Sequence, residues 1–122
     1  MTASILTVDD SPSIRVAIKI ALTNAGYTVT EAANGAEGIE KAQAAAFDMI
    51  ITDLNMPVMD GLTAARAIRA DERWKKLPIV MLTAKAMPDD QQKCIDAGAN
   101  DHMSKPIDVD KLLSLVRVWM PR

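Results

Sequence analysis

The 122-residue sequence has little cysteine, no long hydrophobic run and no recognisable export signal, and each shortage excludes a class of protein. The single Cys94 cannot form a disulfide within one chain, so an apolar core has to hold the fold. No apolar stretch approaches the roughly 20 residues of a transmembrane helix, and the first residues lack the basic segment and cleavage site of a signal peptide. We therefore expect a cytoplasmic protein that does not bind a membrane.

Basic residues are not concentrated in any segment. The 14 Lys and Arg residues are outnumbered by 16 Asp and Glu residues, and no basic run of the kind that follows a phosphate backbone is present. Direct binding to nucleic acid is therefore disfavoured. A content of 49% hydrophobic and 25% charged residues is typical of one globular domain. We expect residues 1–122 to form a single domain without an output domain.

Apolar residues alternate between short runs and helical stripes. The segments between these runs repeat their apolar residues with a period near 3.6, which is typical of helices. The first of these segments has helix signals at both ends: Ser11 can be the N-cap, Pro12 suits the first turn, and Gly26 follows the last turn. Val16 and Ile20 fall outside its main stripe, so this helix is expected to be buried on more than one face. The continuous apolar runs predict buried strands at 4–8, 27–30, 48–52 and 78–83, with a weaker strand at 101–104.

Strands that alternate with helices predict an α/β protein, a (βα)5 doubly wound fold whose five-stranded parallel sheet is covered on both faces. The carboxyl ends of parallel strands emerge at one edge of the sheet, where ligands bind in such folds. Polar side chains are expected to collect at that edge, because the strands end in or run into Asp9 and Asp10, Asp53, Thr83 and Lys105.

Each of these side chains, taken alone, can be interpreted as an ordinary turn, loop or helix-entry residue. Such an interpretation does not explain why all of them are expected at the same place. Carboxylates about 5 Å apart repel by about 3 kcal/mol per pair at an effective dielectric constant near 20. A bound cation would relieve that repulsion. Ligands that are all oxygen, at an edge that faces solvent, suit Mg2+.

Four motifs in this order resemble the receiver domain of two-component response regulators, the CheY-like family: VDDSPSIR, DLNMPVMDG, MLTAKA and SKP. The resemblance covers essentially the whole chain and implies a flavodoxin-like sheet of order 2-1-3-4-5. It implies that Asp53 is the phosphoacceptor, while Thr83 donates a hydrogen bond to a phosphoryl oxygen and Lys105 forms an ion pair there. It also implies that Mg2+ (or Mn2+) is held by Asp9, Asp10, Asp53 and the backbone carbonyl of Asn55.

The chemistry needs no general base, because an aspartate is already ionised at neutral pH and is itself the nucleophile. The resemblance implies that the donor is a phosphohistidine on a histidine kinase or a histidine phosphotransfer protein. The domain is then not an enzyme, although it assists its own phosphorylation and dephosphorylation. Its signal is expected to reach a downstream target protein through the fourth helix, the strand at 101–104 and the last helix.

Two positions depart from the chemotaxis branch of that family. His102 stands where an aromatic switch residue is usual, and we expect it to move together with Thr83. Lys85 stands where that branch has an acidic residue, and we expect Lys85 and Asn55 to flank the phosphoryl group and set its lifetime. The segment 85–106 also resembles receivers fused to hybrid sensor kinases. The alternatives are therefore a receiver module from a hybrid kinase, or an interaction module that signals by partner binding alone.

Other functions fit the residues less well. Phosphatases of the haloacid dehalogenase type carry a second aspartate two positions after the nucleophile, where this chain has Asn55. A flavin phosphate would be repelled by Asp9 and Asp10. Cys94 is interpreted as a packing residue, and Trp119 either caps the core or lies on a partner face.

Overall fold

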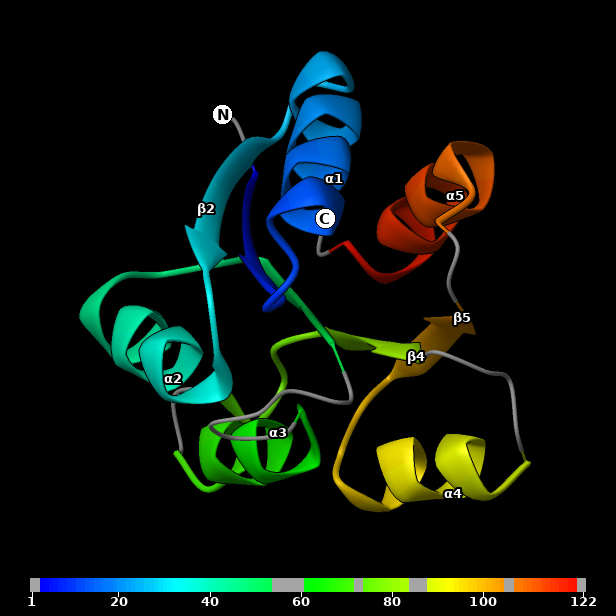
Figure 1. Ribbon diagram of the computed structural model, residues 1–122. Helices are drawn as coiled ribbons and strands as arrows, with labels where there is room; N and C mark the ends of the chain where they lie inside the picture. Colours follow the sequence, from blue (N-terminus) through cyan, green and yellow to red (C-terminus); the bar gives the residue numbers. More distant parts are fainter. Residues whose placement is uncertain (1–2, 54–60, 72–73, 84–87, 105–106, 121–122) are drawn as a thin grey trace.

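The computed structural model describes residues 3–53, 61–71, 74–83, 88–104 and 107–120, and for 61, 62 and 88–91 the backbone alone. Within them, a five-stranded parallel sheet has the order β2-β1-β3-β4-β5, so the predicted α/β fold and strand order are confirmed (Figure 1). The elements in chain order are β1 Ser4–Val8, α1 Pro12–Asn24, β2 Thr28–Ala32, α2 Gly35–Ala44, β3 Met49–Asp53, α3 Gly61–Arg69, β4 Ile79–Thr83, α4 Pro88–Asp96, β5 Asp101–Ser104 and α5 Val109–Trp119.

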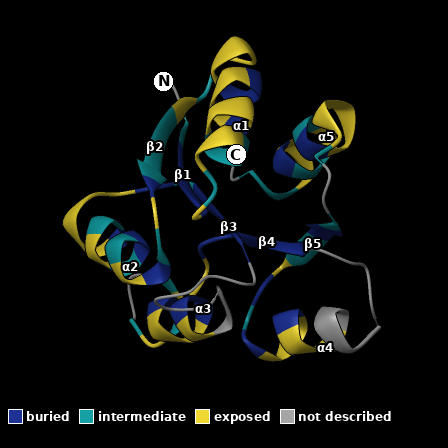
Figure 2. Ribbon diagram, viewed as in Figure 1, coloured by how far each residue is buried: buried dark blue, intermediate teal, exposed yellow. Residues whose placement is uncertain are grey.

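The helices form a layer on each face of the sheet. Helices α1 and α5 cover one face, and α2, α3 and α4 cover the other (Figure 1). Strands β3 and β4 are buried along their whole length, as the dark ribbons at the centre of Figure 2 show. Each face therefore has its own core. The larger residues on the α1/α5 side include Ile5, Ile18, Leu22, Met49, Ile51, Leu82 and Leu112, and those on the other side include Leu6, Ile50, Ile68, Ile79, Met81 and Cys94.

Helix α1 begins and ends as the sequence predicts, but it is buried on only one side. The Ser11 side chain accepts a hydrogen bond from the backbone of Ile14, and Gly26 has a φ of +98°, which the chain reversal after the helix requires. Val16 and Ile20 are 52% and 56% exposed. The expectation of burial on more than one face was wrong, because the outer side of α1 packs against no other described element.

Trp119 contributes to the core and is also fixed by a polar contact. It packs beside the α1/α5 cluster, and its Nε1 donates a hydrogen bond of 2.9 Å to Asp101 Oδ2. This contact connects the end of α5 to the start of β5. Of the two interpretations of Trp119, the structure supports the core cap.

The edge of the sheet where β4 and β5 begin is held by Arg69. Its guanidinium donates to the carbonyl oxygens of Gly98 (3.0 Å) and Trp74 (2.9 Å) and to Asn100 Oδ1 (2.7 Å), and burial lowers the pKa of Arg69. Gly98 has a φ of +100°, and a Cβ there would lie 2.8 Å from Arg69 Cγ. Glycine is thus required at 98 both for the backbone conformation and for the close approach of Arg69.

Candidate functional site

Three carboxylates converge at the edge of the sheet where the strands end, opposite the edge that Arg69 holds. Asp9 and Asp10 directly follow β1, and Asp53 is the last residue of the neighbouring β3, one position later than the predicted end of that strand. Val8 is in register with Thr52, so the residues that follow lie side by side. The three side chains each offer an oxygen within 4.8 Å of the others. Asp9 and Asp53 are only 1% and 4% exposed, whereas Asp10 is exposed to solvent.

Asp9 is held at several of its polar atoms. Its backbone N–H donates to the carbonyl of Ala32 at 3.1 Å, and its Oδ1 accepts from the N–H of Ser11 at 2.8 Å. Its carbonyl oxygen accepts from Arg15 Nη1 at 2.6 Å. No role for Arg15 was predicted from the sequence. Arg15 is the last residue of the VDDSPSIR motif, and a charged residue beside the apolar stripe of the helix was the only indication of one.

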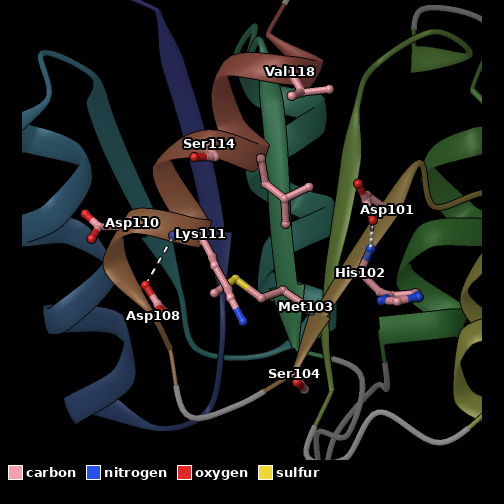
Figure 3. Close-up of a pocket in the computed structure, with 10 residues that line it drawn as sticks. Asp101, His102, Met103, Ser104, Asp108, Asp110, Lys111, Ser114 and Val118 are labelled. Atoms are coloured by element: carbon pink, nitrogen blue, oxygen red, sulfur yellow. Dashed lines mark hydrogen bonds between the residues drawn. The ribbon is translucent and has the colours of Figure 1, made fainter.

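Thr83 and His102 lie on the strands beyond Asp53. Thr83 ends β4, is 2% exposed, and follows Leu82, the register partner of Asp53. His102 is half-buried on β5 opposite Met81, and its backbone N–H is hydrogen-bonded to Asp101 Oδ1. Successive side chains of a strand alternate between faces, and Met103 packs on the α1/α5 side. The His102 ring therefore points away from α5, as Figure 3 shows, toward the face of the sheet that α2, α3 and α4 cover.

Three residues assigned to the site from the sequence lie outside the described residues. They are Asn55, Lys85 and Lys105.

The donor set fits a hard divalent cation. All three converging ligand groups are carboxylates, and the described residues place no histidine or cysteine with them. Mg2+ prefers oxygen ligands and retains several waters, which suits a cluster with two buried carboxylates and one exposed to solvent. The residues of this site therefore fit the predicted metal.

A separate hollow of about 710 Å³ lies between β5 and α5 (Figure 3). Asp101, Asp108 and Asp110 line it with Lys111, around apolar side chains that include Met103. The Asp108 side chain also accepts from the backbone of Lys111 and so caps α5. This hollow belongs to the surface through which we expect the signal to leave.

Comparison with known proteins places the chain among signalling domains. The family model described as "Response regulator receiver domain" matches residues 5–117. The chemotaxis protein CheY of Pseudomonas aeruginosa is 43% identical over 103 residues, which cover 84% of this chain and 83% of that protein. A second relative, the DNA-binding dual master transcriptional regulator RpaA of Synechocystis, is 39% identical over 97% of this chain. The chain spans about half (49%) of that regulator's length.

Solved structures that resemble this chain come from the same kinds of protein as these relatives. The chemotaxis protein CheY4 of Vibrio cholerae superposes with a TM-score of 0.95 at 41% identity, covering 98% of this chain and all of that one. The receiver domain of a sensor histidine kinase from Pseudomonas aeruginosa PAO1 has a TM-score of 0.90 at 36% identity, with 98% of each chain covered. That structure has a magnesium ion coordinated in its active-site cleft. Among the residues described for the present chain, no helix combines the length and apolar character needed to cross a membrane.

Proposed function

This chain belongs to the family of response regulator receiver domains, and from that premise we propose that Asp53 takes a phosphoryl group from a histidine kinase or a histidine phosphotransfer protein. The observation that carries the proposal is the convergence of Asp9, Asp10 and Asp53 at the carboxyl edge of the sheet. Receiver domains are signalling modules of two-component systems, so the product of the reaction is a changed state of this protein and not a released metabolite.

Each residue of the site has its own role in phosphoryl transfer. An Asp53 oxygen attacks the phosphorus in line with the bond to the donor imidazole nitrogen, which breaks as the acyl phosphate forms, and the histidine leaves with the electron pair. Asp9, Asp10, Asp53 and the carbonyl of Asn55 would hold Mg2+ (or Mn2+), which when bound supplies positive charge against the phosphoryl oxygens. The Thr83 hydroxyl would donate to one phosphoryl oxygen, and Lys105 would neutralise another.

The signal would leave through α4, β5 and α5. Thr83 ends the buried β4 at the reacting edge, and His102 lies on β5 beside it, facing the α4 side. A Thr83 side chain drawn to the phosphoryl group would leave space that the His102 ring can enter, and a downstream target would bind the altered surface. Lys85 and Asn55 would set the lifetime of the phosphorylated state by controlling the approach of water.

The receiver of a hybrid sensor kinase is the alternative that a specific observation favours. One structural neighbour, at 36% identity, is the receiver domain of a sensor histidine kinase, and the sensor protein GacS of Pseudomonas syringae matches 94% of this chain with 13% of its own length. The phosphoacceptor chemistry is the same in either setting. An interaction module that signals by partner binding alone would need no phosphoryl group, so uptake of one phosphoryl group at Asp53 would argue against it.

Intact-protein mass spectrometry with acetyl phosphate as the donor tests the proposal. We expect the wild-type protein to gain one phosphoryl group in the presence of Mg2+ and none in excess chelator, and Asp53→Ala to gain none. Asp96→Ala, which removes an exposed carboxylate on α4, is the matched control and should behave as wild type. Undiminished phosphorylation of Asp53→Ala, or of wild type in chelator, would reject the assignment.

A further inference from the structure

We propose that Arg15 is a positioning residue for the cation: from α1 it fixes the backbone of Asp9 and thereby the direction in which the Asp9 carboxylate faces the site. The inference rests on the proposed function in one respect, because it takes Asp9 as a ligand of Mg2+. It adds a residue that contacts neither the cation nor the phosphoryl group and yet determines how tightly the cation is held.

The first support is the geometry around Asp9. Arg15 Nη1 lies 2.6 Å from the Asp9 carbonyl oxygen, and the Arg15 side chain is only 19% exposed. The backbone N–H of Asp9 donates to the carbonyl of Ala32, and Asp9 Oδ1 accepts from the N–H of Ser11. A charged donor on a backbone carbonyl makes a stronger hydrogen bond than a neutral one. Arg15 therefore fixes the peptide group between Asp9 and Asp10, which joins the two Cα atoms that carry these carboxylate side chains.

The second support is that Arg15 is itself held in place. Its Nε lies 3.8 Å from Glu31 Oε1 on the edge strand β2, and Lys19 Nζ lies 3.7 Å from the other oxygen of that carboxylate. Lys41 on α2 donates to the carbonyl oxygen of Glu31. Arg15 thus connects α1, β1 and β2 at the point where the chain enters the site. A lysine could not reproduce this arrangement, because it lacks the planar group that donates in two directions.

The charge of Arg15 and its positioning of Asp9 predict opposite changes in Mg2+ affinity when Arg15 is removed. A positive charge near three carboxylates disfavours a cation, so its removal would tighten Mg2+ binding if charge were its whole contribution. If Arg15 positions Asp9, its removal weakens Mg2+ binding instead. Lys19 provides the reference, because it is on the same helix, carries the same charge and pairs with the same Glu31, whereas the contact described with the Asp9 carbonyl comes from Arg15.

The test is a Mg2+ titration of the full chain, followed by the backbone amide resonances of Asp9, Asp10 and Asp53. Neither phosphorylation nor a partner is needed. We expect the dissociation constant of Arg15→Gln to rise at least three-fold above wild type, and that of Arg15→Lys at least two-fold. For Lys19→Gln we expect no rise. A urea unfolding curve for each variant shows that the titrated protein is folded, and Arg15→Lys, which keeps the charge, supplies the answer if Arg15→Gln does not fold.

Equal dissociation constants for Arg15→Gln and Lys19→Gln, or a fall for both, would overturn the inference and leave the proposed function intact. Wild-type protein without saturable Mg2+ binding would overturn the proposed function and the inference together. The wild-type titration alone therefore distinguishes the two failures.

Discussion

The acidic cluster should cost the folded protein stability that one substitution can recover. Two carboxylates with oxygens no more than 4.8 Å apart repel by about 3 kcal/mol at an effective dielectric constant near 20. Asp53→Asn removes the repulsion with Asp9 and with Asp10 and loses the attraction that we expect from Lys105, which leaves about 3 kcal/mol. Asp10 is exposed, so solvent and salt reduce its share. We expect Asp53→Asn to raise the free energy of unfolding by about 1–2 kcal/mol in chelator.

Urea denaturation followed by circular dichroism measures this gain. With a urea dependence of about 2 kcal/mol per molar, the middle of the usual range for small proteins, the midpoint should rise by roughly 0.5–1 M. Saturating Mg2+ should narrow the difference in unfolding free energy between the variant and wild type. A cation stabilises the folded state more when it binds more tightly, and the variant has lost one ligand. Glu40→Gln, an exposed charge removed from α2, should change stability by less than about 0.5 kcal/mol. If Asp53→Asn is no more stable than wild type in chelator, the electrostatic argument for the site is wrong.

Three further predictions follow from other features. Gly98→Ala should lower the free energy of unfolding by about 1–3 kcal/mol, and by more than Gly26→Ala does. Both glycines have a positive φ, but an added Cβ would contact Arg69 only at position 98, and urea unfolding of the two variants measures the difference. Lys85→Glu should change the rate of dephosphorylation several-fold, about 1 kcal/mol in barrier, with phosphorylation intact; equal decay rates would show that Lys85 has no part in it. Beryllofluoride with Mg2+ should shift the His102 ring resonances in wild type but not in Thr83→Ala, and unchanged ring signals beside moving α4 resonances would exclude His102 from the switch.

The sequence predicted the bounds of all five strands to within two residues. Strands β1 and β5 have the predicted bounds. Strand β2 was predicted at 27–30 but spans Thr28–Ala32, because an edge strand tolerates the charged Glu31 that ended the apolar pattern. The exposure of Val16 and Ile20 could not be predicted, because periodicity shows which residues are apolar and not how many neighbours a helix has.

The convergence of Asp9, Asp10 and Asp53 followed from the rule that parallel strands end at one edge. The role proposed for Arg15 did not, because its partner is a backbone carbonyl, which has no residue type to recognise in a sequence. The roles of Asn55, Lys85 and Lys105 remain predictions, and so does the coupling of Thr83 to His102.

The contacts of Arg69 with Gly98, Trp74 and Asn100 have a consequence for genetics. They lie at the edge of the sheet remote from the carboxylates, so a substitution there lowers the amount of folded protein without changing how a folded molecule binds Mg2+. A screen that scores only signalling in cells would group Gly98 variants with Asp53 variants. Measuring protein abundance beside signalling separates them: loss at 98 follows abundance, whereas loss at 53 occurs at full abundance.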